Sequence, residues 1–231
     1  LVSGHTAAHQ ELEAALADFT GRPRALLFGS GYAANVGTLG ALLGQRDHVF
    51  EDRLNHASLL DGGRLSRAGF EWYDHADHAD LASCLDAHRS SSHRKLIVSD
   101  GTFSMDGDLC PLDDLIALAK QHGAWLMIDE AHSVGVLGKT GTGIEEHFGL
   151  GDVIDIKMGT LSKTIPSVGG YVAANKEIVT YLSHLSRAYM FSAALPPAQA
   201  AAANEAFKVI LDEPWRIERL NQNTKQFIGG L

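Results

Sequence analysis

Short apolar runs that end in polar residues recur along this chain of 231 residues, and helix-like segments separate them. We interpret as strands residues 24–28, 48–51, 95–100, 124–129, 155–163 and 167–174. The helix-like segment before the first strand carries Leu12, Leu16 and Phe19 at helical spacing and stops before Gly21. This alternation predicts an α/β fold whose mostly parallel central sheet is covered by helices on both faces.

Two of these runs end in reactive groups. Residues 125–129 end at Asp129, and residues 155–163 end at Lys163 after small polar residues. Because the carboxyl ends of parallel strands meet at one edge of a sheet, we expect this acid and this amine to share a site. Taken alone, Lys163 also fits a surface residue, and Asp129 also fits a helix cap or a structural ion pair.

The composition excludes several classes of partner. The net charge of −9 and the absence of long Lys/Arg runs argue against nucleic acid or an anionic membrane. No stretch is long and apolar enough for a membrane span, and the start lacks the features of a signal peptide. Cys84 and Cys110 form no CxxC pair, so a reducing cytoplasm is the expected compartment. The chain opens without methionine, and we expect it to be a segment of a longer protein.

An acid and an amine at one sheet edge are typical of a site for pyridoxal 5'-phosphate (PLP). In this hypothesis Lys163 holds the cofactor as a Schiff base and later acts as the general base at the substrate α-carbon. Asp129 holds the pyridine nitrogen protonated, which makes the ring an electron sink. An opposite charge at about 4 Å contributes ~4 kcal/mol, or roughly three pKa units, at an effective dielectric constant of ~20.

The other parts of a PLP site have candidates too. For the phosphate, Gly31 and Tyr32 offer backbone N–H groups where a glycine turn opens a helix, and Thr160 offers a hydroxyl. The remaining candidates surround the ring: His56 over one face, Ala131 beneath it, and His132 and Ser104 at the phenolic oxygen.

Six groups of residues together resemble the α-oxoamine synthase family of fold type I PLP enzymes. They are residues 3–4 with 9–13, 30–35, 52–58, 103–108, 129–132 and 159–163. They follow the family's order over nearly the whole chain, which makes the resemblance more specific than any single motif. It implies that an amino acid condenses with an acyl thioester, with loss of CO2, to give an α-amino ketone. It also implies the ring, phenolic-oxygen and phosphate contacts assigned above.

The resemblance has consequences for assembly and domains. It implies a homodimer with the active site at the subunit interface, where residues 191–197 approach the partner's cofactor phosphate. It places the PLP-binding large domain at residues 1–213 and the start of a small domain at residues 214–231. Within the family, residues 52–62 are most similar to the biotin-pathway branch. Residues 159–163 with 168–171 are closer to the branches that act on serine or belong to polyketide assembly lines.

Three other functions remain as alternatives. An aminotransferase or lyase of the same cofactor class would also use Lys163 and Asp129. A regulatory or scaffolding subunit is disfavoured because Lys163 is present. A serine hydrolase using Ser104, His132 and Asp129 is disfavoured because no G-x-S-x-G motif occurs. The histidines and acids of residues 74–80 are interpreted as a solvated loop and helix cap, so no metal site is predicted.

Overall fold

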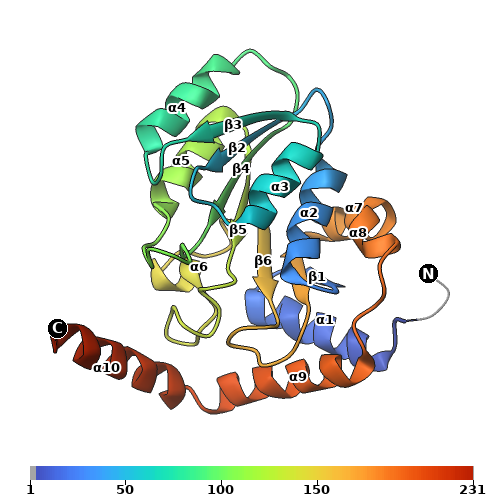
Figure 1. The fold of residues 1–231 in the computed structure, drawn as a ribbon, viewed down its shortest axis with the longest axis vertical. Coiled ribbons are helices and arrows are strands. Elements are labelled where there is room, and N and C mark those ends of the chain that lie inside the picture. The colour runs from blue at the N-terminus through green and yellow to red at the C-terminus, as the bar shows by residue number, and fades with distance from the viewer. Residues whose placement is uncertain (1–3, 231) are drawn as a thin grey trace.

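A seven-stranded sheet forms the centre of the computed structural model, which describes residues 4–230 (Figure 1). The strand order is β1-β7-β6-β5-β4-β2-β3. Neighbouring strands are parallel except that β7 is antiparallel to both β1 and β6. The strands are β1 (Arg24–Phe28), β2 (His48–Asp52), β3 (Gly69–Tyr73), β4 (Lys95–Asp100), β5 (Trp125–Asp129), β6 (Ile156–Thr160) and β7 (Gly170–Ala174). The predicted α/β class and mostly parallel sheet are confirmed.

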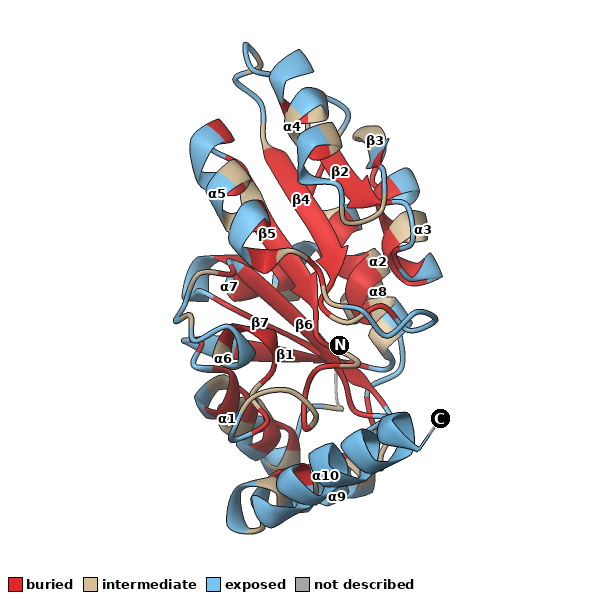
Figure 2. Ribbon diagram, turned by 90° about the vertical axis from the view of Figure 1, so that its left-hand side faces the viewer, coloured by how far each residue is buried: buried red, intermediate tan, exposed pale blue. Residues whose placement is uncertain are grey.

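Helices cover both faces of the sheet, and its strands are largely buried except for the edge strand β3 (Figure 2). One face packs against α2, α3 and α7, whereas the other packs against α4, α5 and α6 at one end and α1 and α9 at the other. The helices are α1 (Ala7–Thr20), α2 (Gly31–Leu42), α3 (Ala57–Leu65), α4 (His78–Ala87), α5 (Leu112–His122), α6 (Ile144–His147), α7 (Lys176–Leu185), α8 (Arg187–Met190), α9 (Pro197–Asp212) and α10 (Trp215–Gly229).

Local signals account for several helix ends. The Ser30 hydroxyl accepts a hydrogen bond from the Ala33 amide at the start of α2. Gly123 ends α5 in the left-handed conformation at φ 59°, which glycine adopts without steric cost. Asp77 caps α4 by accepting from two amides of its first turn, as the loop-and-cap interpretation of residues 74–80 expects.

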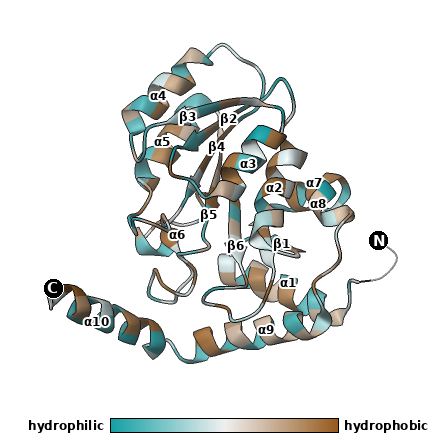
Figure 3. Ribbon diagram, viewed as in Figure 1, coloured by the Kyte–Doolittle hydropathy of each residue, from teal (hydrophilic) through white to brown (hydrophobic). Residues whose placement is uncertain are grey.

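The edge strand β3 was not predicted; except for Tyr73, its residues are partly exposed, so no apolar run marks it. Trp215, Phe227 and Ile228 on α10 are apolar and exposed. Figure 3 shows that hydrophobic and hydrophilic residues alternate along this helix. The division into domains at residue 214 stays a prediction, and Ser3 and Leu231, which belong to sequence assignments made above, lie outside the described residues. Within residues 4–230, no helix has the length and apolar character needed to cross a bilayer.

Candidate active site

A cavity of about 270 Å³ opens at the edge of the sheet where β4, β5 and β6 end. Most of the sequence-predicted site residues line it: Gly31, Tyr32, His56, Asp129, Ala131, His132, Thr160 and Lys163. They come from segments far apart in the chain, and the parallel strands bring them to one edge. The cavity is also lined by Ser30, Ser58, Asp100, Met158 and Ser162.

Asp129 is held in place by two donors. The Asn35 side-chain amide donates to one carboxylate oxygen at 2.8 Å, and the Ala131 backbone N–H donates to the other at 2.9 Å. The carboxyl is nearly sealed from solvent, because the residue is only 3% exposed. Two donors on a buried carboxylate fix its orientation.

His56 is connected to Asp129 by side chains. Its Nδ1 lies 3.2 Å from the Ser58 amide, which can only donate, so Nδ1 accepts and the proton of the neutral ring lies on Nε2. The Ser58 hydroxyl lies 2.7 Å from the same nitrogen and accepts from Asn35 at 2.9 Å. Asn35 therefore joins the acid and the histidine on one hydrogen-bonded path.

Glycine allows the start of α2 to approach the sheet closely. A Cβ on Gly170 would lie 2.7 Å from both the nitrogen and the Cα of Gly31, closer than real atoms allow. A Cβ on Gly31 would lie 3.4 Å from the Thr160 hydroxyl oxygen. Gly31, Tyr32 and Thr160 line the same cavity, so the start of α2 lies beside the Thr160 hydroxyl, which donates to the Gly169 carbonyl at 3.2 Å. The N-terminus of a helix next to a hydroxyl is a suitable place for an anion.

Lys163 is exposed and lines the cavity. Burial lowers the pKa of His132, and the Lys163 ammonium lowers it further. Burial also raises the pKa of Asp100 to about 8, reinforced by the Asp129 carboxylate. At neutral pH the site therefore contains a neutral His132 and a protonated Asp100, which accepts from the His56 amide at 2.7 Å.

In the cofactor-free protein, Asp100 should make stability fall as pH rises from about 4 to about 8. Its pKa is about 8 in the fold against an ordinary 3.8, so in this window the unfolded chain has lost a proton that the folded chain keeps. Asp100→Asn keeps an oxygen for the His56 amide and should flatten the fall by up to ~1.4 kcal/mol per pH unit.

Urea unfolding at about pH 5 and about pH 8 measures this effect as the difference in unfolding free energy. Glu51, whose pKa burial also raises to about 8, remains in the variant and contributes a residual slope. If the unfolding free energy fell equally steeply with pH in the variant and the wild type, the fall would not be due to Asp100.

Ser104 is not among the residues that line the cavity. It lies exposed in a tight turn closed by bonds from the Phe103 amide to the Asp108 carbonyl and from the Gly107 amide to the Phe103 carbonyl. The contact of Ser104 with a phenolic oxygen therefore stays a prediction. Asn35 and Ser58 had no assigned role, although both lie in segments that carry the family resemblance.

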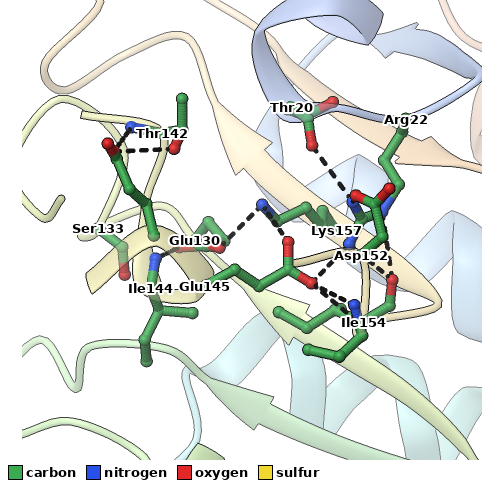
Figure 4. A network of polar contacts seen from close by, with 12 residues as sticks. Thr20, Arg22, Glu130, Ser133, Thr142, Ile144, Glu145, Asp152, Ile154 and Lys157 are labelled. Atoms are coloured by element: carbon green, nitrogen blue, oxygen red, sulfur yellow. Dashed lines mark hydrogen bonds and ion pairs between the residues drawn. The ribbon is translucent and has the colours of Figure 1, made fainter. Parts of the chain in front are cut away.

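A buried ion network supports the loop that follows Asp129 (Figure 4). Lys157, on β6, lies 2.9 Å from a Glu145 oxygen and 3.5 Å from a Glu130 oxygen. Arg22 donates to the other Glu145 oxygen at 2.6 Å. Burial opposes ionisation of Glu145, but Lys157 and Arg22 outweigh it and lower its pKa. Glu130 also accepts from the Ile144 amide at 3.0 Å, which ties α6 to the site loop.

Lys157→Ala should lower the free energy of unfolding by about 3 kcal/mol, because it leaves the buried Glu130 without its cation and Glu145 with Arg22 alone. Urea unfolding at neutral pH measures the loss. Lys139→Ala, at an exposed loop position, is the matched control and should change stability by less than about 0.5 kcal/mol. Equal effects of the two variants would show that the network adds no stability.

Comparisons with known proteins agree with this geometry. The family model described as aminotransferase class I and II matches residues 1–231. The chain belongs to this family. An 8-amino-7-oxononanoate synthase from Methylococcus capsulatus is 51% identical over 231 residues, which are 100% of this chain and 59% of the relative. The chain thus spans about three fifths of the length of such curated relatives.

Solved structures of this aminotransferase class I and II fold are similar as well. A serine palmitoyltransferase from S. paucimobilis with a bound PLP–myriocin adduct has a TM-score of 0.95 and 36% identity, covering 100% of this chain and 57% of that chain. An 8-amino-7-oxononanoate synthase from Francisella tularensis has a TM-score of 0.83 and 32% identity, covering 96% and 64%. These similarities confirm the resemblance to α-oxoamine synthases that the sequence motifs indicate.

Proposed function

We propose that the protein containing this chain is a PLP-dependent acyltransferase that condenses an amino acid with an acyl thioester, with loss of CO2, to give an α-amino ketone. The specific reaction proposed is that of 8-amino-7-oxononanoate synthase, the name carried by relatives about half identical to this chain. The observation that carries the proposal is the shared cavity of Lys163 and Asp129.

The residues of this cavity fit PLP. Lys163 would hold the aldehyde, and the Asp129 carboxylate, already fixed by two donors, would face the pyridine nitrogen. The space bounded by Gly31 and Thr160 would hold the phosphate. When bound, PLP supplies an electron sink for negative charge at the substrate α-carbon.

The chain's own groups would then position the substrate and move its proton. The Lys163 amine would take the proton from the α-carbon and later return one. His56, with its proton on Nε2, would cover the ring face and donate to an amino acid carboxylate. His132 would donate to the phenolic oxygen as a neutral imidazole, because its pKa is lowered. These assignments rest on side-chain placement around the cavity.

A product assay separates this function from its nearest alternative. The full-length protein would be incubated with PLP, each of a small panel of amino acids, and acyl thioesters of coenzyme A or a carrier protein. We expect release of CO2 and free thiol, and mass spectrometry should find an α-amino ketone, with alanine and a pimeloyl thioester as the first pair to test. Release of a keto acid without free thiol would instead indicate an aminotransferase and overturn the proposal.

Assembly and location are part of the same proposal. We expect a homodimer whose active site lies at the subunit interface. The family resemblance assigns the contact with the partner's site to residues 191–197. Of these, Ser192, Ala193 and Ala194 line a hollow of about 480 Å³ that is separate from the candidate active site of their own chain. A cytoplasmic location is consistent with Cys84 and Cys110, which are both free thiols.

A further inference from the structure

A second group of possible ligands lies away from the candidate active site. His48, Glu71 and His88 each offer one ligand atom, and these atoms lie within 4.8 Å of one another. His48 is the first residue of β2, Glu71 lies in β3, and His88 follows the last turn of α4. The active-site cavity lies where β4, β5 and β6 end, whereas His48 lies where β2 begins, so the group lies toward the opposite edge of the sheet.

The three side chains already face one another. His88 Nε2 forms an ion pair with a Glu71 oxygen. The His48 and His88 rings lie 4.0 Å apart between centroids and are tilted by 39°. Gly69 makes room for this arrangement, since a Cβ there would lie 2.7 Å from His48 Nδ1. Two imidazoles and one carboxylate therefore converge on one point between three elements.

One ring nitrogen of His48 is not satisfied by the protein itself. Its Nδ1 is buried and has no hydrogen-bond partner among the residues that the structure describes. A buried nitrogen without a partner is costly, and a metal ion is one way to satisfy an imidazole.

We propose that His48, Glu71 and His88 form a binding site for a divalent transition-metal ion such as Zn²⁺. Two imidazole nitrogens and one carboxylate oxygen suit Zn²⁺, Co²⁺ or Ni²⁺ better than Mg²⁺ or Ca²⁺, which prefer oxygen ligands. Water completes a tetrahedron. At metal–ligand distances of about 2.1 Å, the ligand atoms would stand about 3.4 Å apart. Small rotations close the present spacing and open the direct contact between Glu71 and His88.

Such an ion would fasten the edge of the sheet. It would join strand β3, which has only β2 as a neighbour, to β2 and to the end of α4. Its role would be structural, because the active-site cavity shares none of its ligands. The sequence could not show this group, since its members lie in three separate segments without a ligand-spacing motif.

The test uses the full-length protein after treatment with a chelator, with zinc chloride as the probe. Calorimetric titration should show one tight Zn²⁺ site per chain, and Tm should rise by about 5 °C at a hundredfold excess over Kd. Cobalt chloride should give the visible d–d absorption of a tetrahedral site. Magnesium chloride should do neither.

Substitutions test whether His48, Glu71 and His88 are the ligands of Zn²⁺. His48→Gln, Glu71→Gln and His88→Gln should each weaken Zn²⁺ binding at least about tenfold and remove the rise in Tm. His184→Gln, at an exposed position on α7, is the matched control and should bind as the wild type does. Glu71→Gln keeps the residue's size and serves if a histidine variant fails to fold. Absence of a stoichiometric site in the wild type, or equal binding by all four variants, would overturn the proposal.

Discussion

Replacing Lys163 with alanine should abolish the visible-edge absorption of lysine-bound PLP and reduce condensation activity by about 10²–10⁴-fold or more. The amine would hold the cofactor and move the substrate's α-proton, so its loss removes both actions. The side chain is exposed at the cavity, so the truncation leaves no buried void and the fold should persist. Absorption spectra after gel filtration with PLP measure the bound cofactor, and the product assay measures the activity. Circular dichroism checks that the variant is folded.

Lys176→Ala provides the control. Lys176 lies exposed at the first turn of α7, away from the cavity lining, and its loss should leave both spectrum and activity unchanged. Retention of lysine-bound absorption in the Lys163 variant would assign the cofactor to another amine and remove the basis of the proposed function.

Asp129→Asn should preserve cofactor uptake and yet slow exchange of the substrate's α-hydrogen by about a thousandfold. The expected size follows from the charge: an ion pair at about 4 Å is worth ~4 kcal/mol at an effective dielectric constant of ~20, and each 1.4 kcal/mol is about tenfold in rate. An amide in place of the carboxylate cannot hold the pyridine nitrogen protonated. Proton NMR of amino acid substrate in deuterated buffer measures the exchange.

Folding must be checked separately in this variant, because the new amide turns one of the two acceptors of Asp129 into a donor that faces Asn35 or the Ala131 amide. We expect a stability loss of about 1–3 kcal/mol from the unpaired donor. Asp106→Asn, in an exposed turn, is the control and should change neither quantity. Exchange at the wild-type rate in a folded Asp129 variant would defeat the role assigned to the carboxylate.

The central fold and much of the site follow from the sequence because both depend on strands that are mostly apolar and end in polar residues. Burial on both faces makes β4, β5 and β6 visible as apolar runs, and the residues that end them must reach one edge. The sequence alone therefore predicts that Asp129, Thr160 and Lys163 lie at the same edge of the sheet. The comparisons confirm the α-oxoamine synthase resemblance, while the residue roles stay proposals.

What the sequence missed depends on contacts between distant segments. Strand β3 has mixed burial and no apolar run, so periodicity does not reveal it. The role of Asn35 appears only when α2 is seen beside Asp129, because a helical asparagine usually faces solvent. Asp100 was visible as the end of a strand, but its raised pKa depends on burial beside Asp129, which spacing does not show.

Helix α2 links contacts that a ligand would otherwise meet independently. Its first turn borders the space assigned to the phosphate, and Asn35, in its second turn, bonds both Asp129 and the Ser58 hydroxyl that supports His56. If α2 moved as a rigid body, the space assigned to the phosphate would move with it, and the hydrogen bonds of Asn35 would pull Asp129 and the Ser58–His56 pair in the same direction. Small motions of the subunit should therefore leave the groups proposed to bind the phosphate and the ring of PLP in nearly the same positions relative to one another.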